Sequence, residues 1–265
     1  MAAEFLASDG VRLHYADRGH GDPPLIFVPG WAMPGSVWRA QLDYFAPKHR
    51  VIAFDPRGQG RSEVAAGGYT PERRSQDIAE LIAASGAQRP VLVGWSLAVL
   101  EILAYVKAHG DRACAGLVLV DNSVGEEPPP SYRSNFVAAL RSNRQAAVRG
   151  FVHAMFKTER TPAELDALTV DALRLPLPAA VSLLSWSWPR TAWRDALYAT
   201  GKPVLYVVTP RFAAQAANVH RRRPDIEVEV FPDAGHALFV DEPGRFNLLL
   251  ERFLASTAHA DSGHP

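Results

Sequence analysis

The sequence predicts an α/β protein: a mostly parallel central sheet flanked by helices, with an inserted helical lid. Short apolar runs, each long enough for one strand, alternate along the chain with longer helix-compatible stretches. The runs lack the polar alternation of a strand with one solvated face, which is typical of parallel strands covered on both sides. A long segment without strand character, placed between two such runs, predicts the lid.

The predicted elements follow in chain order. Apolar residues at 5–6 and 11–16 flank Asp9-Gly10, a dipeptide that favours a hairpin. Four buried strands are expected next, with helices between them. The strands cover residues 25–28, 51–54, 91–93 and 117–120, and the helices cover residues 36–45, 72–85 and 97–109. The pattern returns with strands at 204–208 and 226–231 and a closing helix at 243–254.

Residues 123–190 differ from the rest of the chain. They begin with Glu126-Glu127-Pro128-Pro129-Pro130 and continue with helix-like runs at 132–141, 145–156 and 162–173. A helical insertion after one strand of a parallel sheet lies at the carboxyl edge, where ligands bind, so we expect it to act as a lid. The predicted domains are therefore a core of residues 1–122 and 191–265 and a lid of residues 123–190.

The composition argues against several classes of partner. The 265 residues contain 28 basic and 28 acidic side chains, so no net field attracts nucleic acid or an anionic membrane. No apolar stretch approaches the roughly 20 residues that cross a bilayer, and the N-terminus lacks the pattern of a secretory signal. The single cysteine, Cys114, suits a reducing compartment. We therefore expect a cytoplasmic protein without nucleic-acid or membrane partners.

The stretch Gly94-Trp95-Ser96-Leu97-Ala98 joins an expected strand to an expected helix. A serine on such a tight turn projects its hydroxyl from the sheet edge, and small residues on both sides let the strand and the helix approach. The pattern Gly-x-Ser-x-small therefore predicts that Ser96 is a nucleophile rather than a residue that only forms the turn.

A serine nucleophile needs a base, and the base needs a carboxylate that holds its tautomer. His236 follows the strand expected at 226–231 and lies on a glycine-containing loop before the final helix. This position brings it to the same sheet edge as Ser96, a setting that the other histidines lack. His236 is therefore the predicted base.

Four ordered motifs resemble the α/β-hydrolase superfamily, and together they span almost the whole chain. Phe27-Val28-Pro29-Gly30-Trp31 is similar to the loop after the family's third strand, with Pro29 in place of the usual histidine. The following loop, the nucleophile elbow and the histidine loop are represented by Asp55-Pro56-Arg57-Gly58-Gln59-Gly60-Arg61-Ser62, Gly94 to Ala98, and Ala234-Gly235-His236 with Asp241-Glu242-Pro243. The pairing of Gly30-Trp31 with Gly94-Trp95-Ser96-Leu97 is most similar to small carboxylesterases, including the pimeloyl-carrier methyl esterase type.

The resemblance implies an oxyanion hole formed by the backbone N–H groups of Trp31 and Leu97. Leu97 begins a helix, where N–H groups lack intrahelical partners and the helix dipole favours negative charge. The resemblance also implies that Asp55 and Arg57 brace their turn rather than act in catalysis.

Tryptophans are the candidates for the substrate pocket. The Trp31 ring is expected to wall the acyl pocket, and Trp95, Trp186 and Trp188 are further candidates for its lining. For Trp186 and Trp188, which lie near Trp193 at the end of the lid, the alternative is that they pack the lid onto the core.

The third member of the triad departs from the family pattern. The usual acid follows the strand equivalent to residues 204–208, but here that turn reads Thr209-Pro210-Arg211-Phe212-Ala213-Ala214, without a carboxylate. Some family members carry the acid one strand after the elbow, where this chain has Asp121. Asp121 is therefore the predicted acid; an aspartate at this place can instead cap the next segment or hold the lid. Asp233, close to His236 in sequence, is expected to face solvent.

These residues predict a serine hydrolase that cleaves a carboxylic ester or a related acyl compound through an acyl-enzyme on Ser96. The partner is a small-molecule acyl or ester substrate, and neither a metal nor an organic cofactor is implied. Two alternatives stay open. The fold also hosts small-molecule binding proteins with idle catalytic residues, and the same site supports acyl transfer, perhydrolysis or carbon–carbon bond hydrolysis.

Overall fold

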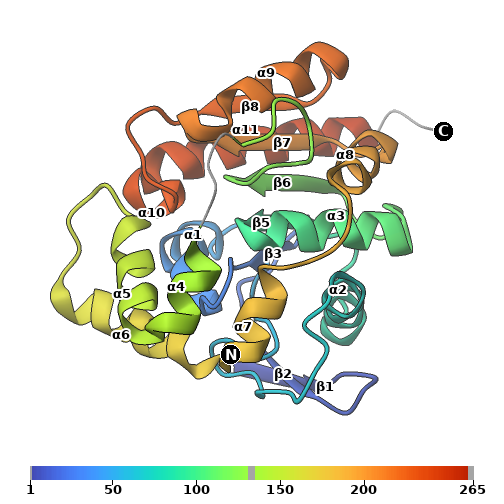
Figure 1. The fold of residues 1–265 in the computed structure, drawn as a ribbon. Coiled ribbons are helices and arrows are strands. Elements are labelled where there is room, and N and C mark those ends of the chain that lie inside the picture. Colours follow the sequence, from blue (N-terminus) through green and yellow to red (C-terminus); the bar gives the residue numbers. More distant parts are fainter. Residues whose placement is uncertain (1, 131–134, 262–265) are drawn as a thin grey trace.

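A computed structural model describes residues 2–130 and 135–261 of the chain. Eight strands form one sheet in the order β1-β2-β4-β3-β5-β6-β7-β8 (Figure 1). β2 runs antiparallel to β1 and β4, and every other neighbouring pair is parallel. The strands are β1 (Ala2–Leu6), β2 (Arg12–Arg18), β3 (Leu25–Val28), β4 (Val51–Asp55), β5 (Val91–Trp95), β6 (Gly116–Val120), β7 (Val204–Val208) and β8 (Glu227–Val230). The predicted α/β fold, a mostly parallel central sheet flanked by helices, is confirmed.

Helices cover both faces of the sheet. Leu25 and Phe27 of β3 pack toward α1 (Arg39–Phe45) and α11 (Pro243–Asp261), whereas the intervening Ile26 packs toward the opposite face. That face is covered by α2 (Pro71–Ser85), α3 (Leu97–His109), α8 (Arg190–Ala199) and α9 (Ala213–Arg222). The strands are apolar throughout because successive side chains point to opposite, equally buried faces.

The strand order places a switch point beside β3. From β3 the chain crosses to β4 on one side and then returns to β5 on the other. The loops that leave the carboxyl ends of β3 and β5 therefore diverge and open a crevice between them, the usual ligand position in an open parallel sheet. The Gly30-Trp31 loop follows β3, and Ser96 follows β5.

In its described part, residues 123–130 and 135–190, the inserted segment contains helices from residue 136 onward and no strand. Figure 1 shows its helices grouped at one end of the core. They are α4 (Phe136–Ser142), α5 (Arg144–Ala154), α6 (Pro162–Arg174) and α7 (Leu177–Leu183). Residues 132–134 of the first predicted helix lie outside the described residues. The division of the chain into a core and a lid stays a prediction.

The last helix, α11, continues to Asp261, past the predicted end at residue 254. Phe253 and Thr257, on either side of that predicted end, lie over Gly116 of β6. A Cβ atom at Gly116 would come within 3.2 Å of the Phe253 ring and 3.3 Å of the Thr257 methyl group. The missing side chain at Gly116 thus gives the helix room to lie closely on the strand.

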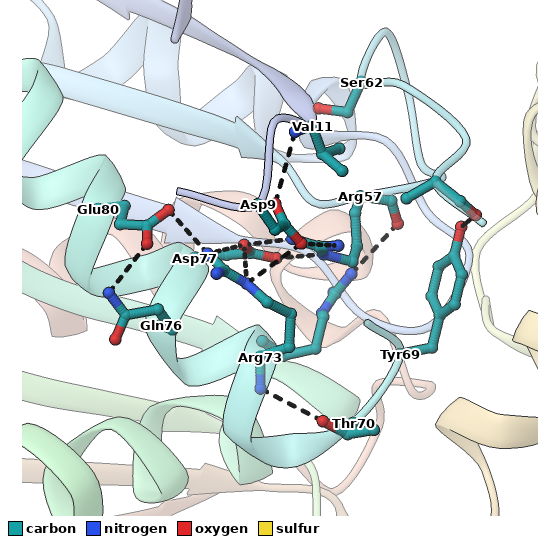
Figure 2. A network of polar contacts seen from close by, with 12 residues as sticks. Asp9, Val11, Arg57, Ser62, Tyr69, Thr70, Arg73, Gln76, Asp77 and Glu80 are labelled. Atoms are coloured by element: carbon teal, nitrogen blue, oxygen red, sulfur yellow. Dashed lines mark hydrogen bonds and ion pairs between the residues drawn. The ribbon is translucent and has the colours of Figure 1, made fainter. Parts of the chain in front are cut away.

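Arg57, in the turn after β4, joins three parts of the fold in the network of Figure 2. Its fully buried guanidinium donates to both carboxylate oxygens of Asp77 in α2, at 2.6 and 2.7 Å, and to Asp9 of the first hairpin at 2.9 Å. Burial alone would lower the pKa of Arg57, but the two carboxylates outweigh this effect and raise it. These contacts agree with the bracing role implied by the resemblance.

Candidate active site

Ser96 lies at the strained turn between β5 and α3. Its backbone has φ 57° and ψ −120°, a conformation that a residue with a side chain rarely adopts. The turn is tight because two glycines give it space. A Cβ atom at Gly94 would lie 2.5 Å from the Ile102 side chain, and one at Gly30 would lie 2.9 Å from the Ser96 Cβ atom. The elbow pattern of the sequence therefore has a steric cause.

Ser96, His236 and Asp121, which are far apart in sequence, come together at the carboxyl edge of the sheet. His236 Nε2 lies 2.8 Å from Ser96 Oγ, and His236 Nδ1 lies 2.7 Å from Asp121 Oδ2. An ionised carboxylate only accepts hydrogen bonds, so the Nδ1 atom carries the proton. Nε2 is then left to accept the hydrogen of the Ser96 hydroxyl.

Asp121 is held from its other side by the turn that lacks the family's usual acid. Asp121 Oδ1 accepts hydrogen bonds from Thr209 N at 2.7 Å and from Thr209 Oγ1 at 2.8 Å. The carboxylate is almost fully buried, with an exposed fraction of 1 %. Thr209 is a site residue that the sequence reasoning missed. The available signal was a hydroxyl residue directly after β7, the strand that pairs with β6 ahead of Asp121.

The loop that carries His236 is fixed by neighbours on both sides. Trp95 donates from its indole Nε1 to the carbonyl oxygen of His236 at 2.8 Å, and its ring lies 5.1 Å from the imidazole. On the other side, Asp241 of α10 (Leu238–Asp241) accepts from Gly235 N at 2.7 Å. The imidazole position therefore depends on contacts to its own main chain as well as on Asp121.

Asp241 also ties this loop to the inserted segment. Besides Gly235, the carboxylate accepts from Lys157 N at 2.9 Å, from Thr158 N at 3.0 Å and from Thr158 Oγ1 at 2.5 Å. Burial acts to raise the pKa of Asp241, but these hydrogen bonds outweigh it and lower the pKa. The charged form of Asp241 thus stabilises the contact between the histidine loop and the segment before α6.

We expect Asp241→Ala to lower the free energy of unfolding by about 1 kcal/mol at neutral pH, because several hydrogen bonds to a partly exposed carboxylate are lost. A folded-state pKa below the unfolded value gives stability that is present above the unfolded pKa and is lost as the pH falls toward the folded value. The difference in free energy of unfolding between the variant and the wild type should therefore shrink below about pH 4. Urea unfolding at several pH values measures it, and a difference that stays constant down to acidic pH would contradict this account.

Trp31 and Leu97, the two predicted oxyanion donors, both line the cavity that contains Ser96. Leu97 is the first residue of α3, so its N–H group has no acceptor within the helix. The loop that carries Trp31 is held by the side chain of Gln59, a fully buried residue of the turn after β4. Gln59 Nε2 donates to the carbonyl oxygens of Gly30 at 3.0 Å and Met33 at 2.8 Å, on either side of Trp31.

Gln59 in turn belongs to a buried chain of contacts that reaches α3. Arg74 Nη2 lies 3.5 Å from Gln59 Oε1, and Arg74 Nε donates to Glu101 Oε1 at 2.7 Å. Burial raises the pKa of Glu101, and the neighbouring Arg74 opposes that shift. Glu101 lies on the helix that begins at Leu97, so one side-chain network connects the loop of Trp31 with that helix. The sequence reasoning did not identify Gln59, Arg74 or Glu101.

A cavity of about 720 Å³ opens above Ser96, within the size range of small-molecule sites. The Trp31 ring forms part of its wall. The rings of Phe136 in α4 and Phe151 in α5 each lie 5.2 Å from it in edge-to-face geometry. The inserted helices therefore supply much of the apolar surface next to the hydroxyl. The lining also includes Leu97, Leu100, Met155, Leu183, Leu184 and Phe212.

The pocket prediction is corrected at three tryptophans, which are not among the described residues that line this cavity. Trp95 is fully buried on the α1 and α11 face of β5. Trp186 donates to the Tyr69 carbonyl at 3.0 Å, and Trp188 donates to Glu72 at 2.7 Å and stacks on Trp193. The indole N–H groups of Trp186 and Trp188 find acceptors just before and at the start of α2, so these two residues pack the end of the inserted segment onto the core.

A family model described as the alpha/beta hydrolase fold matches residues 23–243. The chain belongs to this family. This α/β-hydrolase is 27% identical over 259 residues to a pimeloyl-[acyl-carrier protein] methyl ester esterase of Yersinia enterocolitica, and the match covers 91% of this chain and 97% of that protein. Among solved structures, an esterase of Rhodococcus sp. ECU1013 is similar with a TM-score of 0.83 at 26% identity, covering 97% of this chain and 99% of that one.

A shorter match has higher identity. The hydrolase is 36% identical over 124 residues to a non-heme haloperoxidase of Rhodococcus erythropolis. This match covers 46% of this chain and 43% of the haloperoxidase, so it spans less than half of that relative. The described residues contain no helix long and apolar enough to cross a membrane, and no group of three or more His, Cys, Asp or Glu side chains placed to hold a metal ion.

Proposed function

We propose that the protein is a serine hydrolase of carboxylic esters and that Ser96, His236 and Asp121 form its catalytic triad. The observation that carries the proposal is the continuous pair of contacts from Asp121 Oδ2 through the imidazole to Ser96 Oγ, at 2.7 and 2.8 Å, below an apolar cavity. The ester chemistry of the relatives in Yersinia and Rhodococcus supports the same reaction class. In this proposal the helices α4 to α7 form the lid over the cavity.

The first half of the reaction forms the acyl-enzyme. His236 Nε2 takes the proton of Ser96 as the Oγ atom bonds to the ester carbonyl carbon. The N–H groups of Trp31 and Leu97 stabilise the negative charge that develops on the carbonyl oxygen. The bond to the leaving alcohol then breaks, and the imidazolium gives its proton to that alcohol.

The second half returns the enzyme to its starting state. A water molecule attacks the acyl carbon while His236 accepts one of its protons. The bond between the acyl carbon and Ser96 Oγ breaks, the proton returns to Oγ, and the carboxylic acid leaves. Asp121 holds the imidazole in the working tautomer and stabilises its positive charge in both halves.

Fluorophosphonate labelling read by intact mass tests this proposal directly. A single adduct on the wild type, absent from Ser96→Ala and from His236→Ala, is the expected result, since the probe reacts only with an activated serine. All three proteins should first show the same unfolding transition. A folded wild type that takes no adduct would overturn the proposal and favour the alternative of an idle, small-molecule binding protein.

Gln59 is expected to position the Trp31 N–H group. Replacing it by methionine, which has similar length but no donor, leaves the carbonyls of Gly30 and Met33 without their partner. We expect kcat to fall by about tenfold with little change in KM, because the oxyanion forms only after substrate is bound; removing an oxyanion donor outright costs more. Steady-state kinetics on a soluble ester measures the changes in kcat and in KM separately.

Gln41→Met is the matched control for Gln59→Met. Gln41 is also fully buried, and its Nε2 atom also donates two hydrogen bonds, to the Phe239 carbonyl at 3.0 Å and to Asn247 at 3.1 Å. The two variants should lose similar stability, but only Gln59→Met should lose kcat. An equal loss of kcat in both variants would indicate a general effect of buried polar loss and not positioning of the loop.

A further inference from the structure

We propose that the inserted segment positions the oxyanion loop: helix α7 holds the Trp31 indole and so keeps the backbone N–H group of Trp31 in place for the transition state. This inference rests on the proposed function and specifies which part of the fold controls the oxyanion hole. The Trp31 backbone is the proposed donor to the oxyanion, and its side chain is a positioning group. The contact that carries the inference is the hydrogen bond from Trp31 Nε1 to the Ala180 carbonyl at 2.9 Å.

The Ala180 carbonyl is available because α7 ends close to it. If the helix continued, the N–H group of Leu184 would donate to Ala180, but it donates to the Val181 carbonyl at 3.1 Å instead. Ala180 thus belongs to the last turn, whose carbonyl oxygens lack partners within the helix. Ala180 is also buried, and a buried carbonyl without a partner is costly. The Trp31 indole supplies the missing donor.

The end of α7 is itself fixed to the core. Ser182 Oγ in α7 and the indole Nε1 of Trp186, which follows the helix, both donate to the Tyr69 carbonyl just before α2, each at 3.0 Å. These two bonds hold the last turn of α7 against the core. The hydrogen bond from Trp31 to Ala180 therefore joins the loop after β3 to a firmly placed support.

The loop of Trp31 has a backbone conformation that needs support. Met33 N donates to the Gly30 carbonyl at 3.2 Å and closes a tight turn. Trp31 and Ala32 lie at the centre of this turn, and Ala32 has φ 59°, in the left-handed region that a residue with a Cβ atom seldom adopts. Such a backbone persists where its surroundings determine it. Gln59 holds the two ends of the turn, and the Trp31 indole holds its centre.

Helix α7 therefore acts on the site in two ways. It borders the cavity through Leu183, and through Ala180 it fixes the loop that carries a proposed oxyanion donor. Without the indole hydrogen bond, the turn around Trp31 is free to relax and its N–H group moves away from the oxyanion position. Binding of an uncharged ligand should then change little, whereas stabilisation of a negatively charged oxygen should weaken.

Two ketones with the same butyl chain separate these effects, a trifluoromethyl ketone and the corresponding methyl ketone. With the first, Ser96 Oγ bonds to the carbonyl carbon, the carbonyl oxygen takes the electron pair as an oxyanion, and the Ser96 proton moves to His236 Nε2. The methyl ketone is much less electrophilic and binds in the same cavity without forming this adduct. The ratio of the two dissociation constants, measured by calorimetry, reports oxyanion stabilisation separately from packing of the chain.

Trp31→Phe keeps an aromatic ring at the cavity and removes the donor to Ala180. We expect it to lower the preference for the trifluoromethyl ketone by about tenfold, which is less than the loss when an oxyanion donor is removed outright. Trp188→Phe is the matched control. It also removes an indole hydrogen bond between the inserted segment and the core, to Glu72 at 2.7 Å, but Trp188 does not line the cavity. Its preference should equal that of the wild type.

Each possible outcome has a definite meaning. If the wild type binds the two ketones equally, Ser96 forms no stabilised oxyanion, and the proposed function and the inference fail together. If the wild type prefers the trifluoromethyl ketone and Trp31→Phe retains that preference, the inference alone is overturned. An equal loss in Trp31→Phe and Trp188→Phe also overturns it, because the effect would then not depend on the contact with Ala180. Thermal unfolding of both variants confirms that the proteins compared are folded.

Discussion

Replacing Ser96 by alanine is expected to lower kcat on a soluble ester by about a million-fold, and His236→Ala should cost nearly as much. In the proposed mechanism the two side chains act as one unit, because the proton passes along the 2.8 Å contact between Oγ and Nε2. Removing either one leaves the other without a role in the acyl transfer. The folded state should change little, since Ser96 contributes a single hydroxyl.

The double variant Ser96→Ala/His236→Ala provides the sharper result. If the two residues contributed independently to lowering the activation free energy, their effects would add. The double variant would then be slower than either single variant by another large factor. A shared mechanism predicts that it is no slower than the single variants. Residual turnover above the uncatalysed rate should survive in all three, because the proposed oxyanion donors belong to the backbone. Additive losses, or substantial activity in Ser96→Ala, would contradict the acyl-enzyme on Ser96.

Asp121→Asn is expected to lower kcat by about ten-thousand-fold, with little effect on folding. The structure gives the reason through Thr209. Its N–H and hydroxyl groups both donate to Oδ1 of Asp121, so an asparagine here would place its amide oxygen toward Thr209 and its NH₂ group toward His236. His236 Nδ1 would then have to accept a hydrogen bond, and its proton would move to Nε2. In that tautomer the imidazole has no lone pair for the Ser96 hydroxyl.

Asp233→Asn is the matched control for this experiment. Asp233 is an exposed carboxylate on the same loop as His236, and the identical substitution there should leave kcat close to that of the wild type. Rates are compared on one ester under one set of conditions, with thermal unfolding of both variants. If Asp121→Asn retains turnover within about tenfold of the wild type, Asp121 is not the orienting acid, and its role is limited to holding the turn after β7.

The core of the fold is predictable from the sequence because its strands are short, uninterrupted apolar runs. Strands at residues 25–28 and 51–54 would carry apolar side chains on both faces, so both faces must be buried. This pattern is typical of a parallel sheet covered by helices on two sides. The end of α11 was not predictable in the same way. Beyond the predicted end, Thr257 packs against Gly116, a residue far away in the sequence, and no local pattern contains that contact.

The members of the proposed triad are also readable from sequence, because each one follows a recognisable strand. Ser96, Asp121 and His236 come after β5, β6 and β8, so their meeting follows from the topology. Residues that support them are harder to find. Gln59 and Thr209 act through hydrogen bonds between loops, and a glutamine or a threonine in a loop has many possible partners before the fold is known.

The tryptophans show a different limit to what the sequence can predict about the cavity wall. Large aromatic residues near a pocket are natural candidates for its wall, but an indole that is partly buried also needs an acceptor for its N–H group. Trp31 finds one at Ala180 of α7 and remains at the cavity, whereas Trp186 and Trp188 find theirs beside α2. Which acceptor lies within reach depends on the packing of the inserted segment, and composition does not encode it.

The hydrogen bonds between Thr209 and Asp121 have a consequence for how this enzyme can diversify. With the proposed acid, Asp121, placed after β6, the turn after β7 supplies the backbone N–H and the hydroxyl of one residue, Thr209. Arg211 and Phe212, in the same turn, border the cavity without belonging to the proposed proton path. Selection can therefore alter them as substrates change while the reactive serine is preserved. A mutational library confined to this turn would explore specificity from a starting point that keeps its chemistry.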